Sequence, residues 1–261
     1  MFLRLRDFWM NFFVLEVGMN KSEMLREIIA EAKSIVFFGG AGVSTASGIP
    51  DFRGGDGLYQ KENKYDARPE EILSGRYLMK NPEGFYRYYK NEMIYKDARP
   101  NRAHLALKRL EDEGKLTAVI TQNIDGLHQA AGSRNVIELH GSVLQNYCTV
   151  CTERYGLDFV MKSEGVPLCN KCGNLVRPNV ILYGEGLESE PFCKAELAIS
   201  EADVLIVGGT SLTVYPAASL VSAFRGKHFV IINKTETPYD PYATLIIREP
   251  IERVLEAAVS E

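Results

Sequence analysis

The sequence predicts an α/β protein in which a doubly wound parallel sheet carries smaller insertions. Three observations lead to this fold class. Short apolar runs without polar alternation, such as residues 35–38 and 116–121, indicate strands that are covered on both faces. Similar runs alternate with helical patterns in both halves of the chain. Between the halves, residues 148–172 contain two C-x-x-C pairs, which predict a separate metal-bound module.

The elements follow in order along the chain. Asn20, with Glu23 three residues later, has the pattern of a capping box and predicts a helix that leads into the strand at Ile35. Residues 54–100 are loop-rich and aromatic, which favours short helices covering a cleft. We then expect a helix over 104–113, strands over 116–121 and 136–139, and, after the cysteines, strands over 203–207, 228–232 and 243–247, with helices opened by Pro216 and Pro250.

These elements divide the chain into a sheet domain and its insertions. Residues 1–18 lack the apolar core and cleavage site of a signal peptide and are expected to be a dispensable extension. The predicted division is the extension 1–18, the first part of the sheet domain 19–60, a helical and cofactor-loop insertion 61–100, the second part 101–145, a zinc-binding module 146–177 and the third part 178–261.

Composition limits the classes of function. The chain has 261 residues, 46% of them hydrophobic and 25% charged, which suits a large domain with a small inserted one. A net charge of −4 argues against broad nucleic-acid binding and favours a basic polypeptide substrate. No apolar run reaches the roughly 18 residues that span a bilayer. Four of the five cysteines lie in C-x-x-C pairs, which indicates metal in a reducing compartment and predicts a cytoplasmic protein.

The cysteine spacing predicts a structural metal site. The pattern is C-x2-C-x17-C-x2-C, and four thiolates at this spacing close a tetrahedral Zn²⁺ site without leaving a position for water. The alternative is a coincidental group of buried or redox cysteines. Cys193 stands apart and is interpreted as a small packed residue. The predicted ligands are Cys148, Cys151, Cys169 and Cys172.

A glycine-rich segment follows the first apolar strand. Glycines 40 and 42 let the backbone approach a ligand, and N–H groups in such a turn attract a pyrophosphate. The third glycine of the dinucleotide fingerprint is replaced by Thr45, so the pattern predicts nucleotide binding but not ordinary hydride transfer. The glycine spacing alone would also fit a structural turn. The adjoining Gly48-Ile-Pro-Asp-Phe-Arg53 favours a ligand site, because a turn does not need an acid, an aromatic ring and a guanidinium together.

Polar groups stand at the ends of four further predicted strands. Gln122-Asn-Ile-Asp125 follows one strand and His140 follows the next. His140 is the best candidate for a general base, because imidazole titrates near neutral pH, although a histidine at a strand end is often structural. The other three histidines, His104, His128 and His228, receive the structural interpretation. Gly208-Gly-Thr-Ser211 suits phosphate or ribose, and Asn233 suits ribose hydroxyls.

Taken together, these motifs resemble those of the sirtuins, the Sir2-type NAD-dependent protein deacylases, and most closely microbial deacetylases, over residues 20–261. The resemblance implies a Rossmann-type doubly wound parallel sheet with a smaller inserted zinc-ribbon and helical domain. It also implies NAD as co-substrate and one structural Zn²⁺ per chain. The motifs are residues 40–54, Thr121-Gln-Asn-Ile-Asp125, Leu139-His-Gly141, the four paired cysteines, Arg177-Pro-Asn179, Tyr183-Gly-Glu185 and Gly209-Thr-Ser-Leu-Thr-Val-Tyr-Pro216.

The resemblance also implies roles for single residues. His140 and Asn123 would be catalytic, with Asp125 accepting from the nicotinamide carboxamide and Phe52 shielding the anomeric carbon. The residues implied to bind NAD are Gly40, Ala41, Gly42, Val43, Ser44, Thr45, Ala46, Ser47, Gly48, Ile49, Pro50, Asp51, Phe52, Arg53, Tyr59, Gln122, Asn123, Ile124, Asp125, Gly209, Thr210, Ser211, Asn233, Lys234 and Thr235. An acyl-lysine peptide would add as a strand beside Ile181, Tyr183, Gly184, Glu185, Leu212 and Val214.

The chain departs from the family pattern near the acyl group. It has Leu182-Tyr-Gly-Glu185 where relatives commonly have Phe-Phe-Gly-Glu. The branch that removes acidic acyl groups has a tyrosine followed three residues later by an arginine, whereas this chain has Tyr86 and then Tyr89. A succinyl carboxylate would lack its bidentate partner, so we expect deacetylation rather than desuccinylation.

The predicted function is therefore NAD-dependent removal of acetyl groups from protein lysines, which yields nicotinamide, O-acetyl-ADP-ribose and free lysine. The alternatives are protein mono-ADP-ribosyl transfer, longer-chain deacylation, or a zinc-ribbon scaffold without enzymatic activity. The expected partner is an acetyl-lysine protein, with a basic chromatin protein as one candidate. We expect no direct nucleic-acid partner, no membrane association and a monomeric state.

Overall fold

The structure, a computed structural model, describes residues 20–51 and 64–259. The predicted extension 1–18 and the predicted cofactor residues Phe52, Arg53 and Tyr59 lie outside the described residues. A six-stranded parallel sheet forms the larger body and has the order β3-β2-β1-β7-β8-β9. Its strands are β1 (Ile35–Gly39), β2 (Leu116–Thr121), β3 (Val136–Glu138), β7 (Val204–Gly208), β8 (His228–Ile232) and β9 (Leu245–Ile247).

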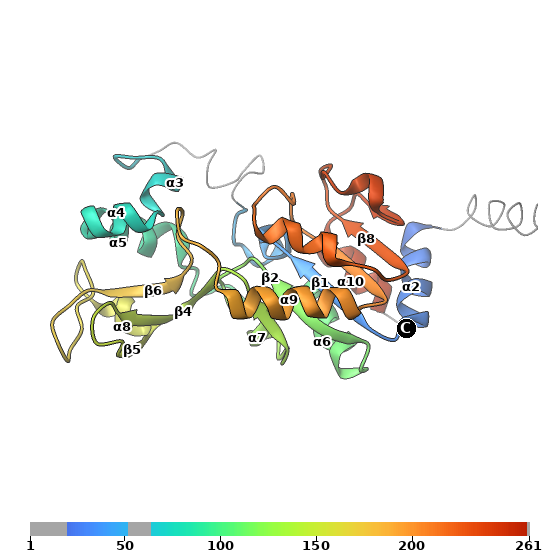
Figure 1. Cartoon of the computed structure of the whole chain (residues 1–261), viewed down its shortest axis with the longest axis horizontal. Helices are drawn as coiled ribbons and strands as arrows, with labels where there is room; N and C mark the ends of the chain where they lie inside the picture. Colours follow the sequence, from blue (N-terminus) through green and yellow to red (C-terminus); the bar gives the residue numbers. More distant parts are fainter. Residues whose placement is uncertain (1–19, 52–63, 260–261) are drawn as a thin grey trace, which may run out of the picture.

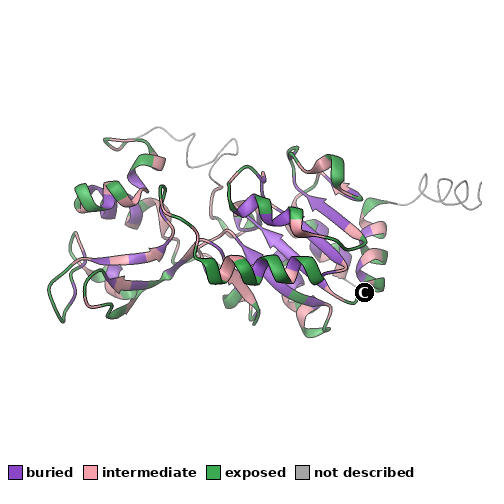
Figure 2. Cartoon of the chain, in the orientation of Figure 1, coloured by how far each residue is buried: buried purple, intermediate pink, exposed green. Residues whose placement is uncertain are grey.

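Helices cover both faces of this sheet, as the apolar strand runs predict. Neighbouring residues of β1 face opposite sides, since Phe37 packs into one apolar cluster and Phe38 into the other, and both are fully buried. The first cluster lies under α2 (Lys21–Glu31), α6 (Arg102–Asp112) and α10 (Ile251–Val259). The second lies under α9 (Ser189–Glu201) and the 3₁₀ helix η4 (Ala217–Ala223). Figure 2 shows the buried residues concentrated in the strands between these layers.

The two insertions come together in a single smaller body, at the left of Figure 1. An antiparallel sheet of order β5-β4-β6 contains β4 (Gly141–Cys148), β5 (Arg154–Gly156) and β6 (Val176–Val180), with α8 (Leu157–Lys162) after β5. Against it pack α3 (Pro69–Ile72), α4 (Gly75–Lys80), α5 (Pro82–Tyr88) and the π turn η3 (Tyr89–Met93). Their shared apolar cluster joins segments that are far apart in the sequence. The sheet begins at Gly141 and ends at Val180, so it extends past both predicted limits of the zinc module.

Helix ends follow their capping residues. The predicted capping box of α2 is confirmed, because Asn20 N donates to Glu23 Oε2 at 3.1 Å and the Asn20 side chain accepts from the first turn. The helix predicted from His104 begins at Arg102 instead, since Asn101 caps it and His104 Nδ1 accepts from Asn101 N. The helix predicted after Pro216 is the 3₁₀ helix η4.

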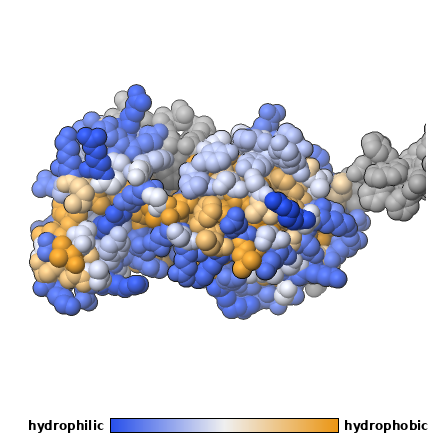
Figure 3. Space-filling view, viewed as in Figure 1, coloured by the Kyte–Doolittle hydropathy of each residue, from blue (hydrophilic) through white to orange (hydrophobic). Residues whose placement is uncertain are grey.

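The surface is mainly hydrophilic at its upper and lower margins, with apolar residues across the middle of the face in Figure 3. In the part of the chain that the structure describes, none of the helices has both the length and the apolar character needed to cross a bilayer.

Candidate active site

The predicted ligand residues gather at one edge of the large sheet. All its strands run parallel, so the segments that follow them meet at the carboxyl edge. Strand order reverses between β1 and β7, because β2 and β3 lie on one side of β1 while β8 and β9 lie beyond β7. Open α/β sheets bind ligands at such a switch point. The loops after β1 and β7 therefore form the expected centre of a nucleotide site.

The glycines of these two loops allow direct contact between backbones. Gly42 N donates to Gly209 O at 2.8 Å, and a Cβ on Gly42 would lie 2.8 Å from Gly209 Cα. Gly209 has a φ of 60°, which favours glycine. A Cβ on Gly40 would likewise meet the Thr210 side chain at 2.7 Å. The glycine spacing left both ligand approach and a structural turn open, and the packing of one loop on the other already requires these glycines.

The loop after β1 contains two 3₁₀ turns, η1 (Ala41–Val43) and η2 (Thr45–Ser47), and is anchored from α6. Asn101 Nδ2 donates to Val43 O at 2.8 Å and to Ser47 Oγ at 2.9 Å. Its Oδ1 accepts from Ala103 N at 2.9 Å, so one side chain caps the helix and holds the loop. Sequence reasoning missed Asn101. An asparagine before a helix indicates a cap, and no local signal points to a partner more than fifty residues away.

A polar network joins the loop to the end of β2. Ser44, which is 1% exposed, donates from Oγ to Asp125 Oδ2 at 2.6 Å and accepts from Asn123 Nδ2 at 3.0 Å. Asp125 Oδ1 accepts from Leu127 N at 2.9 Å. A carboxylate accepts about four hydrogen bonds, so Asp125 retains capacity for an amide donor such as a carboxamide. The structure thus brings together three of the predicted residues, Ser44, Asn123 and Asp125.

His140 follows β3 and is partly buried. Its Nδ1 lies 2.9 Å from the Gln122 carbonyl oxygen, and because a carbonyl only accepts, Nδ1 carries the proton. Nε2 is then the basic nitrogen. Burial lowers the pKa of His140 below its ordinary 6.5 and outweighs the opposing effect of the Gln122 hydrogen bond. The ring is therefore a neutral base at neutral pH.

Gly141, the residue after His140, is required by its backbone conformation and by close backbone packing. Gly141 has a φ of 74°, and a Cβ there would lie 2.0 Å from the Asn179 carbonyl oxygen. Strands β4 and β6 meet at this point, where Gly141 pairs with Val180 and the His140 carbonyl accepts from Ile181 N at 3.0 Å. This contact places the predicted base beside the first residue of the predicted substrate segment.

Two buried histidines, His104 and His128, lie against each other with their rings tilted by 56°. The ring centroids of His104 and His128 are 4.7 Å apart. Burial lowers the pKa of His104 to about 4 and that of His128 to about 3. Both are neutral packing residues, consistent with the structural interpretation of these side chains. His228 begins β8, at the amino edge of the sheet and away from the other predicted site residues.

The loops after β7 and β8 also lie at the carboxyl edge of the large sheet. Gln122 Nε2 donates to Thr210 Oγ1 at 3.4 Å, and Ser211 Oγ pairs with Thr213 Oγ1 at 2.8 Å. The buried Asn233 donates from Nδ2 to Thr235 O at 2.9 Å, so this amide shapes its own turn. Lys234 and Thr235 are exposed on that turn, which precedes the short helix η5 (Asp240–Tyr242).

The predicted substrate segments lie on different bodies. Residues 181–185 follow β6 of the smaller sheet, and residues 212–214 follow β7 of the larger one. Tyr183 is 43% exposed and Gly184 is exposed, whereas Leu212 is buried at a φ of 53°. The Glu185 carboxylate is bound by Arg177, so only its backbone is available to a peptide.

Tyr86 and Tyr89, which stand where the branch that removes acidic acyl groups has its tyrosine and arginine, lie inside the smaller body. Tyr86 is 1% exposed and its hydroxyl donates to the Val176 carbonyl, while Tyr89 stacks on Phe85 and is fully buried. Burial raises the pKa of both hydroxyls, and both remain protonated.

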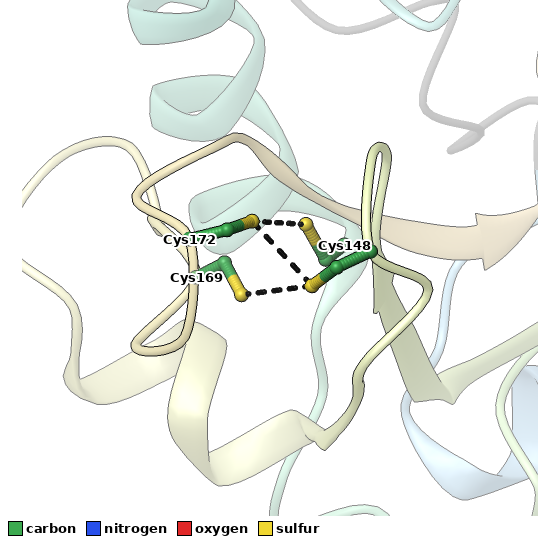
Figure 4. Close-up of side chains that lie close together, drawn as sticks. Cys148, Cys169 and Cys172 are labelled. Carbon is green, nitrogen blue, oxygen red and sulfur yellow. Dashed lines mark hydrogen bonds between the residues drawn. The ribbon is translucent and has the colours of Figure 1, made fainter.

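The four paired cysteines converge, as Figure 4 shows for Cys148, Cys169 and Cys172. All four sulfur atoms lie within 4.8 Å of one another. Neighbouring pairs are 3.4 to 3.5 Å apart. A disulfide would need about 2.05 Å, whereas tetrahedral Zn²⁺ with Zn–S near 2.3 Å separates its sulfurs by about 3.8 Å. The donor set and its closure fit a structural zinc ion. Cys193 lies apart on α9 and is exposed, so its interpretation as a small packed residue is wrong: it stands on the solvent side of a helix that buries Ala195 and Ile199.

These features define a nucleotide-binding α/β protein with a structural metal module. The Sir2 family pattern matches residues 40–216, which is more than half of the chain. The chain belongs to the Sir2 family. It is similar to the NAD-dependent protein deacetylase of Clostridium acetobutylicum, with 52% identity over 242 residues that cover 92% of this chain and 99% of that protein.

Other relatives agree with this assignment. The NAD-dependent protein deacetylase of Clostridium perfringens is 52% identical over 237 residues, covering 90% of this chain and 97% of that protein. Among solved structures, a Sir2 histidine-to-alanine variant described with deacetylated p53 peptide and 3'-O-acetyl ADP ribose has a TM-score of 0.83 and 39% identity, covering 93% of this chain and 100% of that one.

Proposed function

We propose that this chain is an NAD-dependent protein-lysine deacetylase. The single observation that carries the proposal is His140, a neutral imidazole whose Nδ1–H is held by Gln122 and whose Nε2 is left as a base at the carboxyl edge of the sheet. The same edge holds the loops expected to bind NAD. The family membership and the deacetylase relatives support the reaction class.

The chemistry needs one base from the protein. The acetyl oxygen of the substrate attacks the ribose carbon that bears nicotinamide, and nicotinamide leaves with the electrons of the broken C–N bond. A ribose hydroxyl then attacks the resulting imidate while His140 Nε2 accepts the proton relayed from it. Water completes the release of free lysine and O-acetyl-ADP-ribose. Asn123 and Asp125, held by Ser44, would orient the nicotinamide end.

The test measures nicotinamide release with NAD and an acetyl-lysine peptide and identifies the products by mass spectrometry. We expect release that depends on the peptide, with one O-acetyl-ADP-ribose for each lysine freed. His140→Ala should slow it by about 10² to 10⁴, whereas His228→Ala, the matched change at the opposite edge of the sheet, should not. Protein that gains the mass of ADP-ribose would favour mono-ADP-ribosyl transfer. NAD binding without turnover of any acyl peptide would favour the scaffold alternative.

The same assay addresses acyl preference. The Tyr86 hydroxyl is occupied by a backbone carbonyl, and the buried position three residues later is Tyr89 instead of arginine. A succinyl carboxylate would have no bidentate partner there, so we propose a preference for acetyl over succinyl peptides. A panel of acetyl, butyryl, myristoyl and succinyl peptides tests this order. Faster turnover of the succinyl peptide would contradict it.

The finer partner assignments are also proposals. The net charge of −4 supports a basic protein substrate, for which a chromatin-type protein is one candidate. The thiolate-based zinc site supports a reducing compartment, and we propose the cytoplasm. We further propose that the enzyme acts as a monomer, which sedimentation of the purified protein would test.

A further inference from the structure

A bidentate ion pair lies in the smaller body beside the predicted substrate segment. Arg177 Nη1 donates to Glu185 Oε1 at 2.7 Å, and Arg177 Nη2 donates to Glu185 Oε2 at 2.9 Å. The two side chains are only 18% and 27% exposed. Burial alone would raise the pKa of Glu185, but hydrogen bonds from Arg177 and from the Leu182 amide, together with the charge of Arg177, lower it. The carboxylate is therefore ionised and held on both oxygens.

Glu185 connects this pair to the backbone of residues 182–185. Its Oε2 accepts from Leu182 N at 2.9 Å, and Glu185 N donates to Leu182 O at 3.0 Å, which closes a tight turn. Tyr183, inside the turn, donates from N to Leu73 O at 2.9 Å and accepts from Gly75 N at 3.3 Å. One side of the turn is thus held by the α3–α4 connection and the other side by Arg177.

Arg177 in turn depends on the zinc module. In the β4–β6 pairing, Cys148 lies opposite Val176 and Tyr147 lies opposite Arg177. The guanidinium stands 5.8 Å from the centre of the Tyr147 ring, and its Nη2 also donates to Val180 O at 3.1 Å. A metal bound at Cys148 would fix the register of these strands, and that register presents Arg177 to Glu185.

We propose that Arg177 is a positioning residue: it couples the strand register of the zinc module to the conformation of the turn at residues 182–185, and so sets the affinity for the acyl-lysine peptide. This inference rests on the proposed function, in which that turn contacts the peptide backbone. In this proposal Arg177 acts through the Glu185 carboxylate that its guanidinium binds, and not by touching the substrate or the cofactor. Its loss should therefore weaken peptide binding and leave NAD binding and the chemical step in place.

The experiment compares steady-state kinetics of Arg177→Gln with wild type. We expect KM for an acetyl-lysine peptide to rise at least tenfold, with kcat within about threefold and the NAD dissociation constant unchanged. Arg177→Lys should recover part of the loss, because an ammonium restores the charge but cannot span both carboxylate oxygens. The matched control is Lys194→Gln, which breaks an ion pair of the same 2.7 Å length between exposed side chains on α9 and should change neither constant.

A second measurement separates this inference from the proposed function. Amide hydrogen exchange of Leu182 should speed up in Arg177→Gln, while exchange in β1 and β7 stays as in wild type. This readout does not need turnover, so an inactive wild type would refute the deacetylase proposal and leave the positioning role to be judged by exchange. If Arg177→Gln does not fold, Glu185→Gln retains an acceptor for Leu182 N and should show the same pattern to a smaller degree. An unchanged peptide KM with unchanged Leu182 exchange would overturn the inference, as would an equal loss of NAD affinity.

Discussion

Asn101→Asp separates the anchoring of the loop after β1 (residues 40–48) from the capping of α6. Asparagine at this position accepts from Ala103 N through Oδ1 and donates through Nδ2 to Val43 O and Ser47 Oγ. An aspartate can still accept the capping bond, because Asp and Asn are equally good caps. It cannot make either donation, and its second oxygen faces the Val43 carbonyl.

The magnitude follows from the two lost bonds. At about 1 kcal/mol for each hydrogen bond, Asn101→Asp should lower the free energy of unfolding by about 2 kcal/mol. If the two bonds hold the loop in its NAD-binding conformation, their loss lowers the population of that conformation, and with it the NAD affinity, by up to about 30-fold, since 1.4 kcal/mol is tenfold. Asn101→Ala also loses the cap, which adds about 1 kcal/mol to the loss of stability.

The assays are calorimetric titration with NAD and denaturant unfolding. Asn20→Asp is the matched control, because Asn20 caps α2 in the same way on an exposed site away from the loop. It should change neither NAD affinity nor stability by a measurable amount. An Asn101→Asp protein that is destabilised as expected yet binds NAD like wild type would refute the coupling between α6 and NAD binding by the loop after β1.

The remaining predictions concern the base, the metal, the buried histidines and the amino terminus. His140→Ala should lower kcat by about 10² to 10⁴. Wild-type kcat should decline only as pH falls below 6.5, where His140 gains its proton. A decline in kcat that begins above pH 7 would contradict this. Cys148→Ala or chelation should remove the zinc and unfold the smaller body, so a metal-free protein of unchanged stability would exclude a structural metal. Below about pH 6.5 the free energy of unfolding should fall, because His104 and His128 take up protons in the unfolded chain but stay neutral in the folded protein down to about pH 4 and 3. Titration of both rings by NMR checks this prediction. A near-normal pKa at either ring would refute it. Truncation to Met19 should leave folding and activity intact, as thermal unfolding and nicotinamide release would show, and loss of either would make residues 1–18 part of the fold.

Local sequence signals predicted most of the sheet and its edge. Apolar runs such as residues 116–121 match their strands, because residues covered on both faces need no polar alternation. The capping box at Asn20 is equally local. Since parallel strands end at the same edge, the motifs after them were expected to meet there, and Ser44, Asn123 and Asp125 do so. Element ends were less predictable, as α6 and η4 illustrate.

Contacts between distant segments had no such signal. The same glycine pattern suits ligand approach or backbone packing, and only the structure places Gly42 against Gly209. The sequence placed Arg177 and Glu185 in separate motifs, without indicating that they form one ion pair. It marked His140 as a candidate base, but the proton position followed only once the Gln122 carbonyl was found beside Nδ1.

The sequence by itself therefore determined which chemical groups this protein carries and the metal that its four spaced thiols suit. It also determined which segments form strands and helices, because periodicity, capping and ligand spacing act over a few residues. The tertiary structure alone decided which of those groups meet, how the two insertions merge into one body, and which nitrogen of His140 is basic. These depend on atoms brought together across the chain, where the geometry of packing, and no short pattern, selects the partner.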